Sequence, residues 1–100
     1  MSSISIDVVA GGNIQVSGEI TFFTVNQALS LDFLSGQQNI KINLSGVTRS
    51  DSSGLALMVH WLRQARQQGV EMKFENIPDK LLALAKVSNL DEILPIVYRA

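Results

Sequence analysis

The chain has no cysteine among its 100 residues and a single histidine, His60. These absences exclude disulfides, thiolate nucleophiles and the Cys/His sets that hold most structural zinc. His60 falls inside a predicted helix with no acid placed to orient it, and Ser52 and Ser53 lack the GxSxG context of a serine hydrolase. We therefore expect a protein that is not an enzyme and that holds neither a metal nor a cofactor.

An excess of one charge and long apolar runs are also missing. The net charge is −1, and the cations Arg63, Arg66 and Lys73 are scattered, so no basic stripe for nucleic acid is present. No apolar run reaches the roughly 18 residues of a transmembrane helix, so direct membrane insertion is not expected. Residues 1–5 lack the cationic and long apolar regions of a signal peptide. We expect a cytoplasmic protein in which residues 1–100 form one domain.

What the sequence does contain is regular alternation of apolar and polar residues, which indicates half-buried strands. Two such runs flank the turn at residues 10–13, where Gly11 and Gly12 can take positive φ, and together they predict a β-hairpin. The predicted strands are residues 4–8, 14–17, 40–44, 70–74 and 96–98.

Helical segments separate these strands. Residues 55–68 contain neither Gly nor Pro before Gly69 and carry an apolar stripe expected to face the sheet: Leu55, Met58, Val59, Leu62 and Ala65. Residues 24–34 and 80–86 predict two more helices. Alternating strands and helices imply a parallel crossover through helix 55–68. The expected fold class is α/β: a small mixed sheet of four or five strands, covered mainly on one face by three or four helices.

A short polar turn, Asp-Ser-Ser-Gly at residues 51–54, joins strand 40–44 to helix 55–68. Asp and Ser are good helix N-caps, so the turn has a purely structural interpretation. A hydroxyl at this place also lies beside the unpaired amides and the positive end of the helix dipole, which suits a phosphate. Local chemistry leaves both interpretations open.

With this turn after strand 40–44, and with an opening hairpin that ends Ser17-Gly18-Glu19, the chain resembles a STAS domain over essentially its whole length. STAS domains occur in anti-sigma-factor antagonists and at the cytoplasmic ends of sulfate transporters. In the antagonists, a partner kinase phosphorylates the hydroxyl residue directly after the Asp. The resemblance therefore implies that Ser52 is a phosphorylation switch.

Residues 51–60, Asp79-Lys80 and residues 84–90 (Leu-Ala-Lys-Val-Ser-Asn-Leu) are similar to the small STAS subunits of Mla-type phospholipid ABC transporters. This branch implies binding to, and support of, the transporter's ATPase subunit, hence peripheral association with the inner membrane. Those subunits often carry Thr-Gly after the Asp, whereas this chain has Ser52 and Ser53, as antagonists commonly do. An anti-sigma factor kinase is therefore the alternative partner.

The side of helix 55–68 that faces away from the sheet is expected to hold the partner, because it carries little charge near its start. A lone exposed leucine, however, needs no partner to explain it. Taken alone, His60 is explained as a solvated or interface histidine, and Trp61 as a core residue. The predicted partner-binding residues are Asp51, Ser52, Ser53, Gly54, Ala56, Leu57 and His60.

Overall fold

The computed structural model describes residues 3–28 and 38–97. Its strands are β1 (Ile4–Val9), β2 (Asn13–Ile20), β3 (Asn39–Ser50), β4 (Glu71–Glu75) and β5 (Ile96–Val97). Its helices are α1 (Ser53–Gln67), α2 (Asp79–Val87) and the 3-10 turns η1 (Ala10–Gly12), η2 (Val25–Ala28) and η4 (Leu90–Glu92). In the part of the chain described, neither α-helix is long and apolar enough to cross a membrane.

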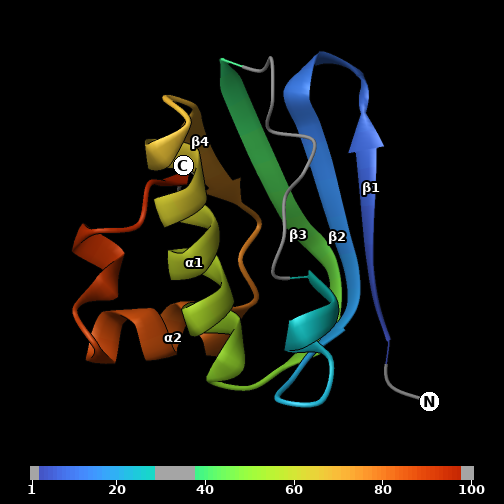
Figure 1. The fold of residues 1–100 in the computed structure, drawn as a ribbon. Coiled ribbons are helices and arrows are strands. Elements are labelled where there is room, and N and C mark those ends of the chain that lie inside the picture. Colours follow the sequence, from blue (N-terminus) through green and yellow to red (C-terminus); the bar gives the residue numbers. More distant parts are fainter. Residues whose placement is uncertain (1–2, 29–37, 98–100) are drawn as a thin grey trace.

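The five strands form one sheet in the order β1-β2-β3-β4-β5. β1 and β2 are antiparallel, which confirms the predicted hairpin, and Gly11 and Gly12 take φ of +79° in its turn. The remaining neighbours, β2–β3, β3–β4 and β4–β5, are parallel. The mixed sheet and the crossover through α1 agree with the predicted fold class (Figure 1).

The core lies between one face of the sheet and the helices. Alternate residues of the central strands are fully or almost fully buried, namely Ile14, Val16, Ile40, Ile42, Leu44, Met72 and Phe74. Their polar neighbours, such as Gln15, Lys41 and Lys73, are exposed. The strands therefore have one apolar face, which the helices cover, and one polar face, which is exposed to solvent.

β3 is longer than the predicted strand at residues 40–44, because it continues to Ser50. The buried alternation stops after Leu44, and the extension is held instead by backbone pairing with β2. Gly46 permits this pairing, since a Cβ there would lie 2.8 Å from the Cβ of Ser17. Backbone pairing without buried side chains leaves no apolar pattern in the sequence to predict it.

The helices are fewer than the three or four expected, with two α-helices in the described ranges. The predicted helix at residues 24–34 begins as the 3-10 turn η2, and its residues 29–34 lie outside the described residues. The predicted helix at residues 80–86 corresponds to α2.

Candidate functional site

The turn between β3 and α1 is fixed by Asp51 rather than by a serine. The Asp51 Oδ1 atom accepts a hydrogen bond of 2.8 Å from the Ser53 backbone N–H, which caps the start of α1. The Oδ2 atom accepts a second bond of 3.1 Å from the Phe22 backbone N–H. The Asp51 N–H in turn donates to the Ile20 carbonyl at 3.1 Å. Asp51 therefore ties the turn to the end of β2 through both its side chain and its backbone.

These contacts favour the ionised carboxylate. Desolvation of the carboxylate acts to raise the pKa of Asp51, whereas the hydrogen bonds from the Ser53 and Phe22 backbones lower it. The Ser53 hydroxyl and the charge of Arg49 act in the same direction, so the pKa of Asp51 lies below its ordinary value. The turn thus carries a negative charge at neutral pH.

Ser52 occupies the N-cap position of α1, but its side chain makes no capping hydrogen bond. Its carbonyl accepts from the Leu55 N–H at 3.2 Å, and the residue is exposed. Because Asp51 performs the capping, the Ser52 hydroxyl is available to a partner or a modifying enzyme. Ser53 beside it is half-buried.

The expectation that Leu57 lies on an exposed strip of α1 is wrong. Leu57 is completely buried, and α1 contacts α2 as well as the sheet. Gly54, one turn earlier on the same side, allows this approach: a Cβ there would meet the two Leu81 methyl groups at 3.0 and 3.1 Å.

The other positions on α1 follow the prediction more closely. Leu55, Met58, Leu62 and Ala65 are buried, and Val59 is half-buried. Trp61 is in the core, where its indole N–H donates to the Ala28 carbonyl at 2.7 Å. Of the predicted partner-binding residues, Asp51, Ser52 and Ala56 are exposed, Ser53 and His60 are half-buried, and Gly54 and Leu57 are buried.

The sequence prediction missed two aromatic residues beside the turn. Phe22 is 73% exposed and Phe23 is 82% exposed, and their rings pack edge to face with centroids 5.8 Å apart. They lie in the loop between β2 and η2, whose Phe22 N–H is bound by Asp51. The Thr-Phe-Phe-Thr sequence was the available signal, but nothing in it indicates that residues 22 and 51 are neighbours.

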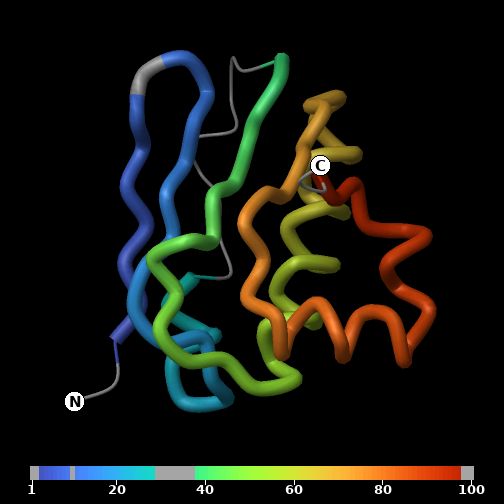
Figure 2. The backbone as a smooth tube through the Cα atoms, turned by 180° about the vertical axis from the view of Figure 1, so that it is seen from behind, coloured from blue at the N-terminus to red at the C-terminus, as the bar shows by residue number. Residues whose placement is uncertain are grey.

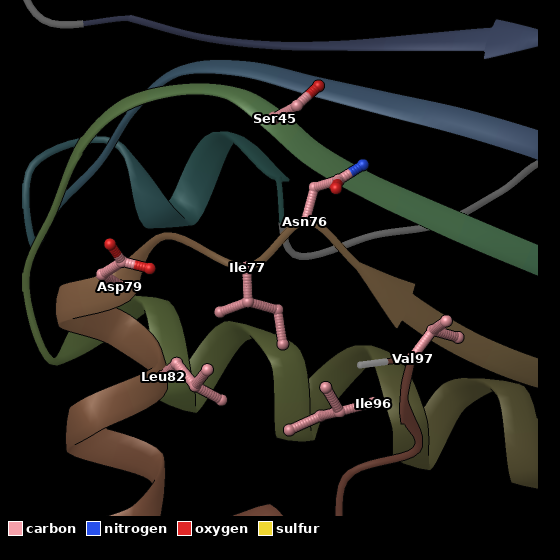
Figure 3. A pocket seen from close by; sticks show the side chains of 7 residues that line it. All are labelled: Ser45, Asn76, Ile77, Asp79, Leu82, Ile96 and Val97. Carbon is pink, nitrogen blue, oxygen red and sulfur yellow. The ribbon is translucent and has the colours of Figure 1, made fainter. Parts of the chain in front are cut away.

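Two hollows border the described structure. One, of about 380 Å³, is a shallow groove next to the turn, lined by Ser50, Lys80, Ala83, Leu84 and Val87. The other, of about 360 Å³, lies beyond the end of β4, between the middle of β3, the start of α2 and β5, and its lining residues are Ser45, Asn76, Ile77, Asp79, Leu82, Ile96 and Val97. Figure 3 shows the aliphatic side chains of Ile77, Leu82 and Ile96 gathered in this second hollow.

The polar rim of the second hollow is partly satisfied within the protein. The Asn76 side-chain amide donates to Asn43 Oδ1 at 3.0 Å, and the Ser45 N–H donates to the same oxygen at 2.9 Å. No group of three or more His, Cys, Asp or Glu side chains within residues 3–28 and 38–97 is placed to hold a metal ion. The serine turn, with Ser52 exposed at the start of α1, is the candidate functional site.

Comparison with solved structures shows the fold. The structure of the unphosphorylated anti-sigma factor antagonist SpoIIAA superposes with a TM-score of 0.66, covering 97% of this chain and 89% of that one, at 14% identity. A crystal structure from Thermotoga maritima superposes with a TM-score of 0.68 over 96% of this chain and 86% of that one, at 18% identity.

Sequence relatives come from two groups. The Escherichia coli intermembrane phospholipid transport system binding protein MlaB is 42% identical over 55 residues, which is 54% of this chain and 57% of that protein. The match thus spans little more than half of that relative. The Bacillus subtilis anti-sigma-B factor antagonist is 26% identical over 99 residues, covering 94% of this chain and 91% of that protein. The family model described as "Mlab, STAS domain" matches residues 8–97, so the chain belongs to the STAS domain family.

Proposed function

We propose that this chain is a non-enzymatic STAS subunit that binds and supports the ATPase of an ABC-type phospholipid transport system. It docks through the turn that begins at Asp51 and the first turns of α1. The complex holds it at the cytoplasmic side of the inner membrane. The 42% identity to the E. coli phospholipid transport protein supports the assignment to a phospholipid transport system. The docking site is inferred from Ser52, which is exposed and whose side chain makes no capping hydrogen bond.

The arrangement around Ser52 is suited to docking. Asp51 holds the turn by three hydrogen bonds, so a partner meets a preorganised surface and loses little binding free energy in ordering it. The start of α1 offers Ser52 and Ala56 as exposed residues of small size, with His60 half-buried beyond them. Small side chains allow a partner backbone to approach the helix closely.

Binding of the purified chain to the transporter's ATPase tests this proposal. Ser52→Glu places a bulky charge beside the Asp51 carboxylate, and we expect it to weaken binding while the protein stays folded. Gln67→Glu adds the same charge on an exposed residue at the far end of α1 and serves as the matched control. Equal affinity of the wild-type and Ser52→Glu proteins for the ATPase would show that Ser52 is not part of the interface.

A second candidate function is that of an anti-sigma-factor antagonist controlled by phosphorylation of Ser52. The relative that favours it, the B. subtilis antagonist, matches nearly the whole chain. A kinase would transfer the γ-phosphoryl group of ATP to the Ser52 oxygen, adding about 1.5 to 2 negative charges next to Asp51. The start of the helix tolerates an anion, but a partner docked on the turn would be repelled.

The two functions predict different partners. Affinity capture with the chain as bait should recover the ATPase with its permease in the first case, and an anti-sigma factor kinase in the second. Incubation with each candidate and ATP, followed by intact mass measurement, then shows whether Ser52 gains a phosphoryl group. Ser52→Ala is the control for the modified position.

A further inference from the structure

The side chains of the exposed aromatic pair contribute little to the stability of the described structure. The phenyl rings of Phe22 and Phe23 remain largely in solvent, so they bury little apolar area on folding. The loop is closed instead by threonines: Thr24 Oγ1 accepts from the Thr21 N–H at 2.9 Å and donates to the Glu19 carbonyl at 2.7 Å. Two adjacent exposed phenylalanines are unfavourable in water, and binding of a partner explains them better than folding does.

The pair is also fixed to the serine turn. Asp51 accepts from the Phe22 N–H and caps α1 with its other oxygen, so one side chain joins the loop to the turn. In Figure 1 the loop that follows β2, the segment between β3 and α1, and α2 all lie at the lower edge of the molecule. Figure 2 shows the same three segments together from behind. The loop that carries the aromatic rings and the turn that carries Ser52 therefore lie at the same end of the molecule, within reach of one partner.

Apolar surface continues on the other side of the turn. Ser50, the residue before Asp51, borders the groove that Leu84 and Val87 line, and Val87 is 83% exposed. Lys80 lies in the same groove. Apolar patches on both sides of a polar turn have the composition of a protein interface, in which aromatic side chains are enriched.

We infer that the Phe22–Phe23 pair is the apolar anchor by which this chain docks on the ATPase subunit, and that the ATPase presents an apolar recess that receives the rings. This inference rests on the proposed function. The occupant is the ATPase because the pair is continuous with the serine turn through Asp51. A second copy of this chain is the competing occupant.

The test compares four purified proteins: the wild type, a Phe22→Ser/Phe23→Ser double variant, Ser52→Glu and Val8→Ser. Val8 is 59% exposed and pairs with Ile14, whereas the Asp51 N–H bonds to Ile20 at the other end of β2. It is therefore an exposed apolar residue remote from the turn. Binding to the purified ATPase is measured by calorimetry, thermal melts verify folding, and sedimentation measures self-association.

We expect the double variant to raise Kd by at least about 30-fold with its melt near that of the wild type. Val8→Ser should change Kd by less than about threefold. If Ser52→Glu weakens binding and the double variant does not, the inference about the Phe22–Phe23 pair is wrong, and the proposal that the serine turn binds the ATPase is kept. If neither weakens binding, both fail. Loss of a wild-type dimer in the double variant with unchanged ATPase affinity would assign the pair to self-association and overturn the inference.

Should the double variant melt well below the wild type, the single variants Phe22→Ser and Phe23→Ser replace it. The side chain of Phe23 is the more exposed of the two, and its backbone N–H, which a substitution by Ser retains, donates to Thr21 Oγ1 at 3.3 Å. A folded Phe23→Ser protein that binds as tightly as Val8→Ser would overturn the inference.

Discussion

The Asp51 carboxylate and the Phe22 backbone N–H are joined by a hydrogen bond of 3.1 Å although they are 29 residues apart. With its second oxygen Asp51 caps α1 at Ser53. One side chain thus fixes two loops that together form the candidate docking surface, and its loss should affect both stability and binding.

Replacement of Asp51 by Ala should lower the free energy of unfolding by about 1–2 kcal/mol, because a cap and a second hydrogen bond are lost together. Asp79→Ala is the matched control, since Asp79 stands in the first turn of α2 and no side-chain hydrogen bond caps that helix. Urea unfolding followed by the fluorescence of Trp61, the only tryptophan, measures both. Equal losses would show that the Asp51 contacts contribute little.

The same carboxylate gives a pH dependence of defined sign. Its pKa is lowered on folding from an ordinary value of 3.8, so its stabilisation is complete above that value. The stabilisation is lost as the pH falls through 3.8 toward the folded-state pKa. The difference in unfolding free energy between the wild type and Asp51→Asn should therefore be constant from about pH 7 to pH 5 and shrink below about pH 4. A difference that grows with acidification would contradict the assignment.

Ser52→Ala should change stability by less than about 0.5 kcal/mol, because the hydroxyl makes no capping hydrogen bond and the residue is exposed. Ser53→Ala is the informative comparison, since the Ser53 hydroxyl contacts the Asp51 carboxylate. Thermal melts of the two variants at neutral pH provide the measurement. A loss above about 1 kcal/mol for Ser52→Ala would mean that this serine caps the helix in solution.

Leu57→Ala should destabilise the protein by about 2–5 kcal/mol, as expected for a fully buried leucine. Leu62→Ala should fall in the same range, while Ala56→Ser, on the exposed side of the same helix, should stay within about 0.5 kcal/mol. Urea melts of the three variants separate the buried side of α1 from the exposed one. A Leu57→Ala protein as stable as the wild type would contradict the burial of Leu57 and favour the exposed position that the sequence prediction gave it.

Much of the fold follows from local pattern. The alternation in β1, β2 and β4 and the glycine turn of the hairpin identified these strands, and the stripe Leu55, Met58 and Leu62 identified the buried side of α1. These features depend on residues close together in the chain, so the sequence carries them directly.

The errors have a common cause in contacts between distant segments. Leu57 lies outside the apolar stripe that the periodicity identified, yet it is fully buried, and α2 approaches the same helix closely at Gly54 through Leu81. The serine turn was found, but the roles of Asp51 as cap and of Phe22 as its neighbour depend on a bond across 29 residues. Periodicity contains no information about such pairs.

The order of the strands in the sheet matches their order in the chain. Each new strand can therefore add to the free edge left by the one before it, and no earlier pair has to open to admit a later strand. The loop closed at each step is a single hairpin or a single crossover, so the entropic cost of closure stays small. As the chain emerges during synthesis, the hairpin of β1 and β2 can form first and serve as the template on which β3, β4 and β5 assemble in turn.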